Sequence, residues 1–185
     1  MGEEKIRKIV RILKENFSNF KQEHIIEDLE KSIEDFGIEV RYALLEDEIS
    51  GFSRVVDGKP QVIVNGEHPE NRRRFTMAHE LGHIILHWKW LNKENQRLDD
   101  YHYEILYRQE SSYYNGNLRE EIQANAFAAE FLMPIEDVKK MLKGKQEKDL
   151  SRNEKSYHIK KLAHKYRVSD QTARIQLEKA FKLNE

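Results

Sequence analysis

The sequence predicts an α+β fold in which a small β-sheet packs on a buried helix. Three observations lead to this prediction. Apolar residues recur at helical spacing over residues 3–15 and 22–36. Residues 38–65 instead contain alternating apolar positions and a hairpin signal, and helical patterns return from residue 74 onward. With 185 residues, the chain suits one domain with a substantial hydrophobic core.

The N-terminal region is predicted to form two amphipathic helices, over residues 3–15 and 22–36. Gly37 follows the second helix, where glycine commonly ends a helix in the left-handed conformation. The apolar positions are Ile6, Ile9, Val10 and Leu13 in the first helix, and Ile25, Ile26, Leu29, Ile33 and Phe36 in the second.

Strands are predicted next in the chain. The first is expected to bury one face made of Ile38, Val40, Tyr42 and Leu44. A second strand covers about residues 51–56, and the turn Asp57-Gly58 leads into a third strand over residues 61–65. Residues 101–107 alternate more weakly and predict a further short strand. These strands are expected to form a small sheet beside the helix that follows residue 74.

That helix contains the run His79-Glu80-Leu81-Gly82-His83, inside the segment RFTMAHELGHIILH. At 3.6 residues per turn, His79 and His83 lie one turn apart on one face and can direct both imidazoles at one ion. Glu80 is expected to act as the general base, taking a proton from a water whose pKa zinc lowers to about 7. Burying two histidines and a carboxylate in an apolar stretch is costly unless they have a partner. A zinc site is therefore preferred over a core helix whose histidines only bond to neighbours.

A catalytic zinc site needs a third protein ligand, and residues 119–134 are the best source. This stretch is rich in alanine and ends at a proline, which predicts a close-packed helix. Glu121 and Asn125 share one face with two alanines, so Glu121 is predicted to reach the metal. Asn125 would accept a hydrogen bond from a ligand histidine and fix its ring. The plainer reading makes Glu121 a first-turn carboxylate favoured by the helix dipole.

Other candidate ligands are weaker. Glu120 points about 100° away from the face of Glu121, and Glu130 lies about half a turn off it. His87 would lie about 6 Å beyond His83 along the helix, too far to share the ion, so it is expected to be a helix-terminal histidine. Four further histidines have no partner pattern and are expected on the surface: His24, His68, His158 and His164.

Composition excludes several classes of protein. The chain has no cysteine, which excludes disulfides, cysteine-based zinc sites and thiol catalysis. It has no apolar run of 18 residues or more, and its start lacks the apolar centre of a signal peptide. A cytoplasmic location without membrane association is therefore expected.

The segment RFTMAHELGHIILH is followed, after a 33-residue insert from Trp88 to Glu120, by EIQANAFAAEFLMP. Together these segments resemble the ImmA/IrrE family of metallopeptidases, whose pattern is RFTxAHELGHxxLH and then ExxANxFAAxLLMP. Phe131 stands where the family usually has leucine, a change that a core can accommodate. Ser50-Gly51 and residues 62–65 resemble the family's glycine-containing strand and its hydrophobic strand ending in asparagine. The likeness covers most of residues 36–180.

The resemblance implies a zincin-like fold and a cytoplasmic zinc endopeptidase that cleaves a transcriptional repressor of a mobile element, phage or stress-response locus. Carried over by position, the metal ligands would be His79, His83 and Glu121, with Glu80 as the catalytic base. A sheet edge is expected to hold the substrate as an added strand. Candidates for stabilising the oxyanion rest on chemistry alone and are Tyr101, His102, Tyr103, Tyr113 and Tyr114.

The C-terminal region differs in charge from the rest of the chain. Residues 139–185 hold 14 Lys/Arg and 6 Asp/Glu, a net of +8, whereas residues 1–138 carry −9. We therefore expect a peptidase domain over residues 1–138 and a basic helical segment, packed on it, over residues 139–185. Within that segment, residues 158–178 are similar to a helix-turn-helix, with Ser169 or Asp170 as the cap of its second helix.

The helix-turn-helix pattern leaves two alternatives to an endopeptidase. One is a DNA-binding regulator, and the other is an antirepressor that sequesters its partner without cutting it. The second helix offers Gln171, Arg174 and Gln176 but no dense basic face. A structural or repressor-docking role is therefore preferred over direct DNA binding.

Overall fold

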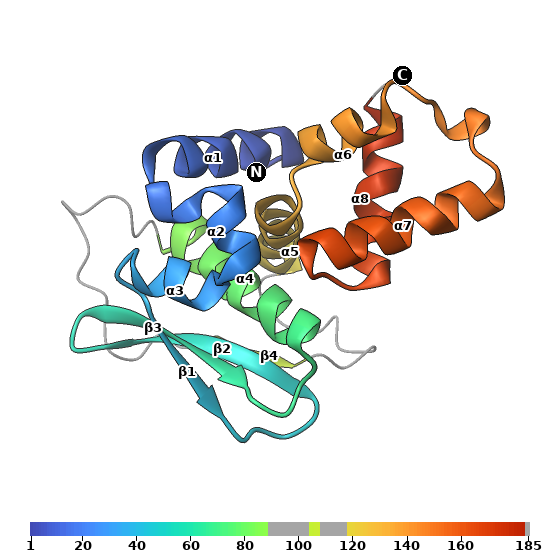
Figure 1. The fold of residues 1–185 in the computed structure, drawn as a ribbon. Coiled ribbons are helices and arrows are strands. Elements are labelled where there is room, and N and C mark those ends of the chain that lie inside the picture. The colour runs from blue at the N-terminus through green and yellow to red at the C-terminus, as the bar shows by residue number, and fades with distance from the viewer. Residues whose placement is uncertain (89–103, 108–117, 184–185) are drawn as a thin grey trace.

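The computed structural model describes residues 1–88, 104–107 and 118–183. These residues form eight α-helices, two short 3₁₀ helices and one four-stranded sheet, and so confirm the predicted α+β class (Figure 1). Within these ranges, no helix combines the length and the apolar character needed to cross a membrane.

The N-terminal region confirms the first predicted helix and corrects the second. Residues 22–36 are split into two short helices at Asp28, whose side chain accepts a hydrogen bond from the Lys31 amide at 3.0 Å. An aspartate that caps a new helix competes with continuation of the previous one, which explains the break. Gly37 has a φ of +96° and ends the region in the expected left-handed conformation. The elements are α1 (Glu3–Asn16), η1 (Ser18–Phe20), α2 (Gln22–Glu27) and α3 (Leu29–Glu34).

The sheet has the strand order β1-β3-β2-β4. β1 pairs parallel with β3, whereas β2 pairs antiparallel with both β3 and β4. Asp57 and Gly58 both have positive φ, at 50° and 72°, and make the predicted hairpin turn between β2 and β3. Only residues 104–107 of the predicted strand 101–107 are described, and they form β4. The strands are β1 (Glu39–Ala43), β2 (Ile49–Val56), β3 (Lys59–Asn65) and β4 (Glu104–Tyr107).

Two burial predictions in this region are wrong. Ile38 and Val40 are buried as expected, but Tyr42 is 44% exposed and Leu44 is 83% exposed. β1 is at an edge of the sheet, and Leu44 lies beyond its last residue, Ala43. His68 was expected on the surface but is buried, where its Nε2 lies 3.1 Å from the backbone oxygen of Asp47.

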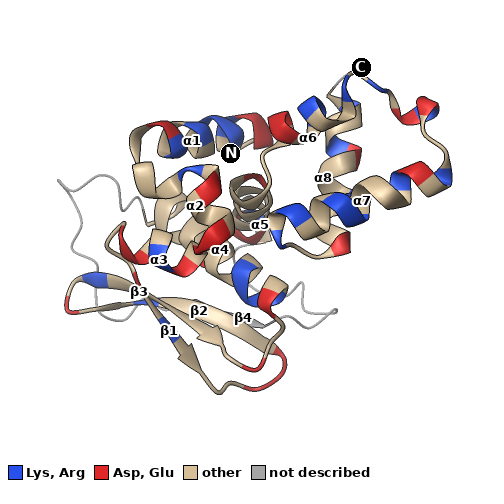
Figure 2. Cartoon of the chain, in the orientation of Figure 1, with Lys and Arg blue, Asp and Glu red and all other residues tan. Residues whose placement is uncertain are grey.

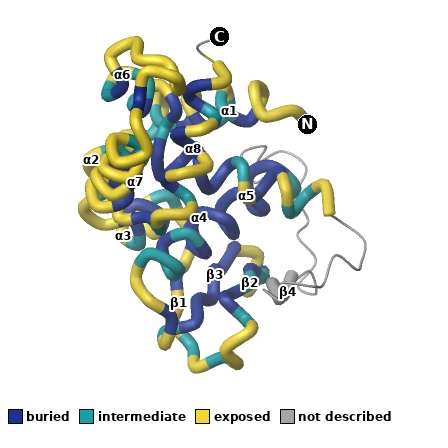
Figure 3. Tube along the Cα trace, turned by 90° about the vertical axis from the view of Figure 1, so that its right-hand side faces the viewer, coloured by how far each residue is buried: buried dark blue, intermediate teal, exposed yellow. Residues whose placement is uncertain are grey.

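The core lies between the sheet and two long helices, α4 (Glu70–Leu86) and α5 (Leu118–Leu132). α4 packs on β2 and β3 with one side and on α5 with the other, and α1 covers α5. Figure 3 shows the resulting continuous buried layer through α4 and the sheet. Gly82 of α4 permits this close packing, because a Cβ there would lie 3.1 Å from Phe127 Cδ1 and 3.3 Å from Ala124 Cα.

The C-terminal segment packs on the rest of the molecule through its last helix and through the turn that precedes this helix. The Gln176 side chain donates to the Met133 backbone oxygen at 2.8 Å, and Arg167 donates to the carbonyls of Ile26 and Glu27 at 2.9 and 3.0 Å. Ser169 caps that last helix by accepting from the Thr172 amide. The expected boundary after residue 138 falls inside a helix. The elements are α6 (Ile135–Leu142), η2 (Glu147–Asp149), α7 (Arg152–Tyr166) and α8 (Asp170–Lys182).

Candidate metal centre and active site

Two histidines of α4 lie side by side in the interior. His79 is 3% exposed and His83 is 0% exposed, and their Nε2 atoms are 2.9 Å apart. They lie one turn apart because α4 is regular through the whole segment Glu70–Leu86. The structure therefore brings both imidazoles to one point, as their spacing predicts.

α5 supplies a carboxylate at the same point. Glu121 Oε2 lies 3.2 Å from His79 Nε2, and Glu121 Oε1 lies 3.2 Å from His83 Nε2. The three side chains offer ligand atoms that all lie within 4.8 Å of one another and could hold a metal ion. No other such group occurs among the described residues.

The two rival carboxylates lie elsewhere. Glu130 is buried at the far end of α5, where both of its oxygens lie 3.3 Å from the amide of Ile135 at the start of α6. Glu120 precedes Glu121 on the helix, and it is not part of the cluster found among the described residues. Among the described residues, Glu121 is the carboxylate that forms a potential ligand group with the two histidines.

The site's electrostatics favour a neutral imidazole and an ionised carboxylate. Burial lowers the pKa of His79, and the carboxylate of Glu121 opposes this shift only in part. Burial acts to raise the pKa of Glu121, but the neighbouring His79 and His83 outweigh it and lower this pKa to about 2. Metal ligands must have these two protonation states, because an imidazolium nitrogen has no lone pair to give.

Glu80 projects from α4 toward the sheet and is completely buried. The hydroxyl of Ser53, also fully buried, donates to Glu80 Oε2 at 2.7 Å. Gly51, two residues earlier on the same face of β2, lets the strand approach α4. A Cβ at this position would lie 2.7 Å from Thr76 Cγ2. Sequence reasoning did not identify Ser53, although its place two residues after a strand glycine is a usable signal.

The ring nitrogens that face away from the cluster also have neighbours. His79 Nδ1 lies 3.0 Å from Asn125 Oδ1, the contact predicted for Asn125. His83 Nδ1 lies 3.0 Å from Nδ1 of His87, which is the C-terminal cap of α4. His87 is thus at the helix end as expected, but it contacts a candidate ligand, and sequence reasoning missed that contact.

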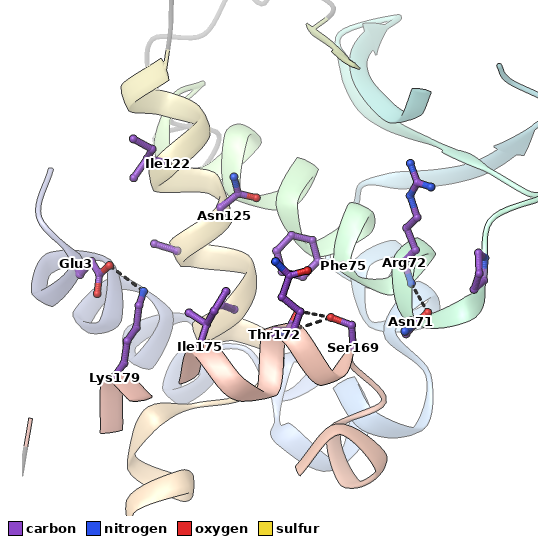
Figure 4. Close-up of a pocket in the computed structure, with 14 residues that line it drawn as sticks. Glu3, Asn71, Arg72, Phe75, Ile122, Asn125, Ser169, Thr172, Ile175 and Lys179 are labelled. Atoms are coloured by element: carbon purple, nitrogen blue, oxygen red, sulfur yellow. Dashed lines mark hydrogen bonds and ion pairs between the residues drawn. The ribbon is translucent and has the colours of Figure 1, made fainter. Parts of the chain in front are cut away.

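A groove of about 790 Å³ opens beside Asn125, between α4, α5 and α8 (Figure 4). Its wall is largely apolar and includes Phe75, Ile122, Ala126 and Ile175. Ile122 and Ile175 are 56% and 43% exposed and both line this groove. The candidates for an oxyanion donor, Tyr101, His102, Tyr103, Tyr113 and Tyr114, lie outside the described residues.

Comparisons with known proteins agree with this geometry. The family model of peptidase M78, described as the IrrE N-terminal-like domain, matches residues 33–178. This range contains the whole cluster, Glu80, Ser53 and most of the C-terminal helices. Comparison with the curated proteins gave no match.

Proposed function

We propose that this chain, which belongs to the peptidase M78 family of IrrE N-terminal-like metallopeptidases, is a zinc-dependent endopeptidase that cuts a transcriptional repressor. The observation that carries this proposal is the meeting of His79, His83 and Glu121 from two helices, with Glu80 beside them. Family membership supports metal-dependent peptide hydrolysis. Zinc and the repressor are our proposals.

The donor set suits zinc. Tetrahedral ligands about 2.0–2.1 Å from a zinc ion are about 3.3 Å from one another. The two imidazole Nε2 atoms here are 2.9 Å apart, and each of them lies 3.2 Å from one of the two oxygens of the Glu121 carboxylate. Two imidazoles and one carboxylate also match the ligand set of a catalytic zinc site, in which a fourth position stays open.

Bound zinc would act as a Lewis acid that polarises the scissile carbonyl and lowers the pKa of the attacking water. Glu80 accepts a proton from that water as its oxygen bonds to the carbonyl carbon. When the carbon–nitrogen bond breaks, Glu80 returns the proton to the leaving amine. Ser53, through its 2.7 Å hydrogen bond, holds the Glu80 carboxylate in place for both transfers.

An added strand on the sheet is our proposed mode of substrate binding. Among the described strands, β4 lies at an edge of the sheet, next to β2, which carries Ser53. Main-chain hydrogen bonds would hold a peptide paired with this edge with little regard to its sequence. This mode suits an exposed loop or linker of a repressor in the cytoplasm.

Two variants test the function in separate steps. Glu80→Gln should retain about one zinc per chain and lose cleavage, whereas Glu121→Ala should lose zinc after mild dialysis. Metal content is measured by mass spectrometry. Cleavage is measured by comparing new protein N-termini in cells that express the wild type or Glu80→Gln.

The outcomes separate the three candidate functions. A repressor-derived N-terminus that depends on Glu80 supports the endopeptidase. Full antirepression by Glu80→Gln would instead indicate sequestration without cutting. Salt-sensitive binding of duplex DNA that Arg174→Ala weakens, with no cleavage, would favour a DNA-binding regulator.

A further inference from the structure

Three hydrogen bonds link the second histidine of the proposed metal site to a backbone carbonyl. His83 Nδ1 lies 3.0 Å from His87 Nδ1, and His87 Nε2 lies 3.2 Å from the amide oxygen of Gln123. The amide nitrogen of Gln123 then donates to the backbone oxygen of Met1 at 3.3 Å. This series of hydrogen bonds therefore joins α4, α5 and the segment before α1.

The Met1 backbone oxygen, at the end of this series of hydrogen bonds, determines which atom donates in each of them. A backbone carbonyl can only accept, so Gln123 presents its amide nitrogen to Met1 and its amide oxygen to His87. An amide oxygen can only accept, so His87 donates from Nε2. A neutral imidazole has one N–H, which leaves Nδ1 of His87 as an acceptor. His83 must then donate from Nδ1.

This direction matches what a metal ligand needs. A histidine that donates from Nδ1 keeps its lone pair on Nε2. Nε2 of His83 is the atom that faces His79 and Glu121. We propose that His87 and Gln123 are positioning residues, which fix the tautomer and ring orientation of His83 for metal binding. This inference rests on the proposed metal site.

Burial of these residues makes the loss of any one of the three hydrogen bonds costly. His83 is fully buried and Gln123 is 7% exposed, so each broken link would leave a polar group in the interior. The rings of His83 and His87 lie with centroids 5.0 Å apart, in direct contact. His79 has the corresponding arrangement with Asn125, so both candidate ligand histidines are held from the side opposite the metal.

Metal affinity of the full-length chain tests the proposal without any need for a substrate. His87→Phe retains an aromatic ring and removes both nitrogens, and Gln123→Leu removes the acceptor. Each should weaken zinc binding about 10–100-fold in competition with a chromogenic chelator. Gln123→Glu can still accept from His87 but loses the hydrogen bond to Met1, so its zinc affinity should fall less than that of Gln123→Leu. His164→Phe, at an exposed position of α7, is the matched control and should bind as the wild type does.

Spectroscopy separates positioning from packing. The visible spectrum of the Co²⁺-loaded protein should change in His87→Phe and Gln123→Leu, and less in Gln123→Glu. Long-range ¹⁵N–¹H correlation on the zinc-loaded wild type should show His87 protonated at Nε2 and bare at Nδ1. If His87→Phe fails to fold, the comparison of Gln123→Leu with Gln123→Glu decides the matter.

Several results would overturn the proposal. These are wild-type zinc affinity in His87→Phe and Gln123→Leu, equal loss in Gln123→Leu and Gln123→Glu, or an Nδ1-protonated His87. Each of them leaves the endopeptidase proposal intact. A wild-type chain that binds no zinc would remove both proposals at once, and this result is distinct from all the others.

Discussion

At the scale of single residues, Ser53 and Glu80 form a buried pair that joins β2 to α4 through one hydrogen bond of 2.7 Å. Glu80 was identifiable because its role depends on neighbours within one helical turn. Ser53 lies 27 positions away in the chain, and its hydroxyl reaches Glu80 only because β2 packs against α4 in one register. The same limit applies to Gln123, whose contact with His87 depends on how α5 is rotated against α4. Local spacing contains no information on such pairs.

Lys14 gives a prediction on pH at this scale. Its Nζ donates to the Phe131 backbone oxygen at 2.7 Å and to the side chain of Gln22, and burial lowers its pKa to about 7. The unfolded chain keeps this lysine protonated up to about 10.5. Between these two values the unfolded state binds more protons, so this lysine makes the free energy of unfolding rise with pH, by at most about 1.4 kcal/mol per unit.

Urea unfolding at pH 7, 8 and 9 checks this expectation. Lys14→Met removes the titrating group, so the difference in unfolding free energy between the wild type and this variant should grow with pH in favour of the wild type. Lys8→Met, at an exposed position of the same helix, should leave the pH dependence as it is. The expectation would be contradicted if the unfolding free energies of the wild type and Lys14→Met changed with pH by the same amount.

At the scale of elements, the contact between α4 and α5 depends on Gly82. A methyl group there would lie 3.1 Å from Phe127 Cδ1 and 3.3 Å from Ala124 Cα. Gly82→Ala should separate the helices slightly, lower the free energy of unfolding by about 1–3 kcal/mol and weaken metal binding, because Glu121 moves relative to the histidines. Thermal unfolding and a zinc titration measure both effects.

Gly66→Ala is the control for this substitution. A Cβ at Gly66 would make only an ordinary contact, 3.7 Å from Tyr42 Cβ. This variant should leave zinc affinity unchanged. Equal zinc affinity in Gly82→Ala and the wild type would show that the packing of α4 on α5 does not set the geometry of the cluster.

The elements that the sequence predicted well are those defined by local signals. The hairpin at Asp57-Gly58 and α8 with its Ser169 cap are examples. The errors arose where tertiary packing decides. Tyr42 continues an alternating apolar pattern, yet it lies at an edge strand near the guanidinium of Arg73 and bonded to Glu30. Its pattern could not show which part of the strand the helices cover.

At the scale of the whole molecule, the basic C-terminal segment contacts acidic groups of the N-terminal part. Figure 2 shows the Lys and Arg positions along α7 and α8. Lys179 pairs with Glu3 at 2.8 Å (Figure 4), and Arg167 pairs with Glu70. Exposed pairs of this kind contribute about 0–1 kcal/mol each. They are nevertheless consistent with a segment that belongs to the peptidase fold, because the same helix buries Ala173, Leu177 and Phe181 in the common core.

Removal of the metal should destabilise the whole fold, because the cluster joins α4 to α5, the two helices that pack most extensively on each other. Free zinc at 1,000 times its Kd would contribute about 4 kcal/mol. For a chain of this size, that contribution corresponds to a fall in Tm of roughly 8–16 °C on chelation. Calorimetry with and without a chelator measures the shift. In Glu121→Ala, the chelator should change the Tm only slightly. A fall in Tm as large as that of the wild type would argue against the cluster as the metal site.

The three residues of the cluster are synthesised at different times. Glu121 follows His83 by 38 positions, so a growing chain exposes two histidines for some seconds before the carboxylate is made, at roughly 5–20 residues per second. Two imidazoles on one helix form an incomplete site that holds an ion weakly. On the proposed function, zinc would therefore be loaded late in biogenesis, after α5 has been synthesised and has docked. A cell short of zinc would then accumulate full-length, metal-free chains.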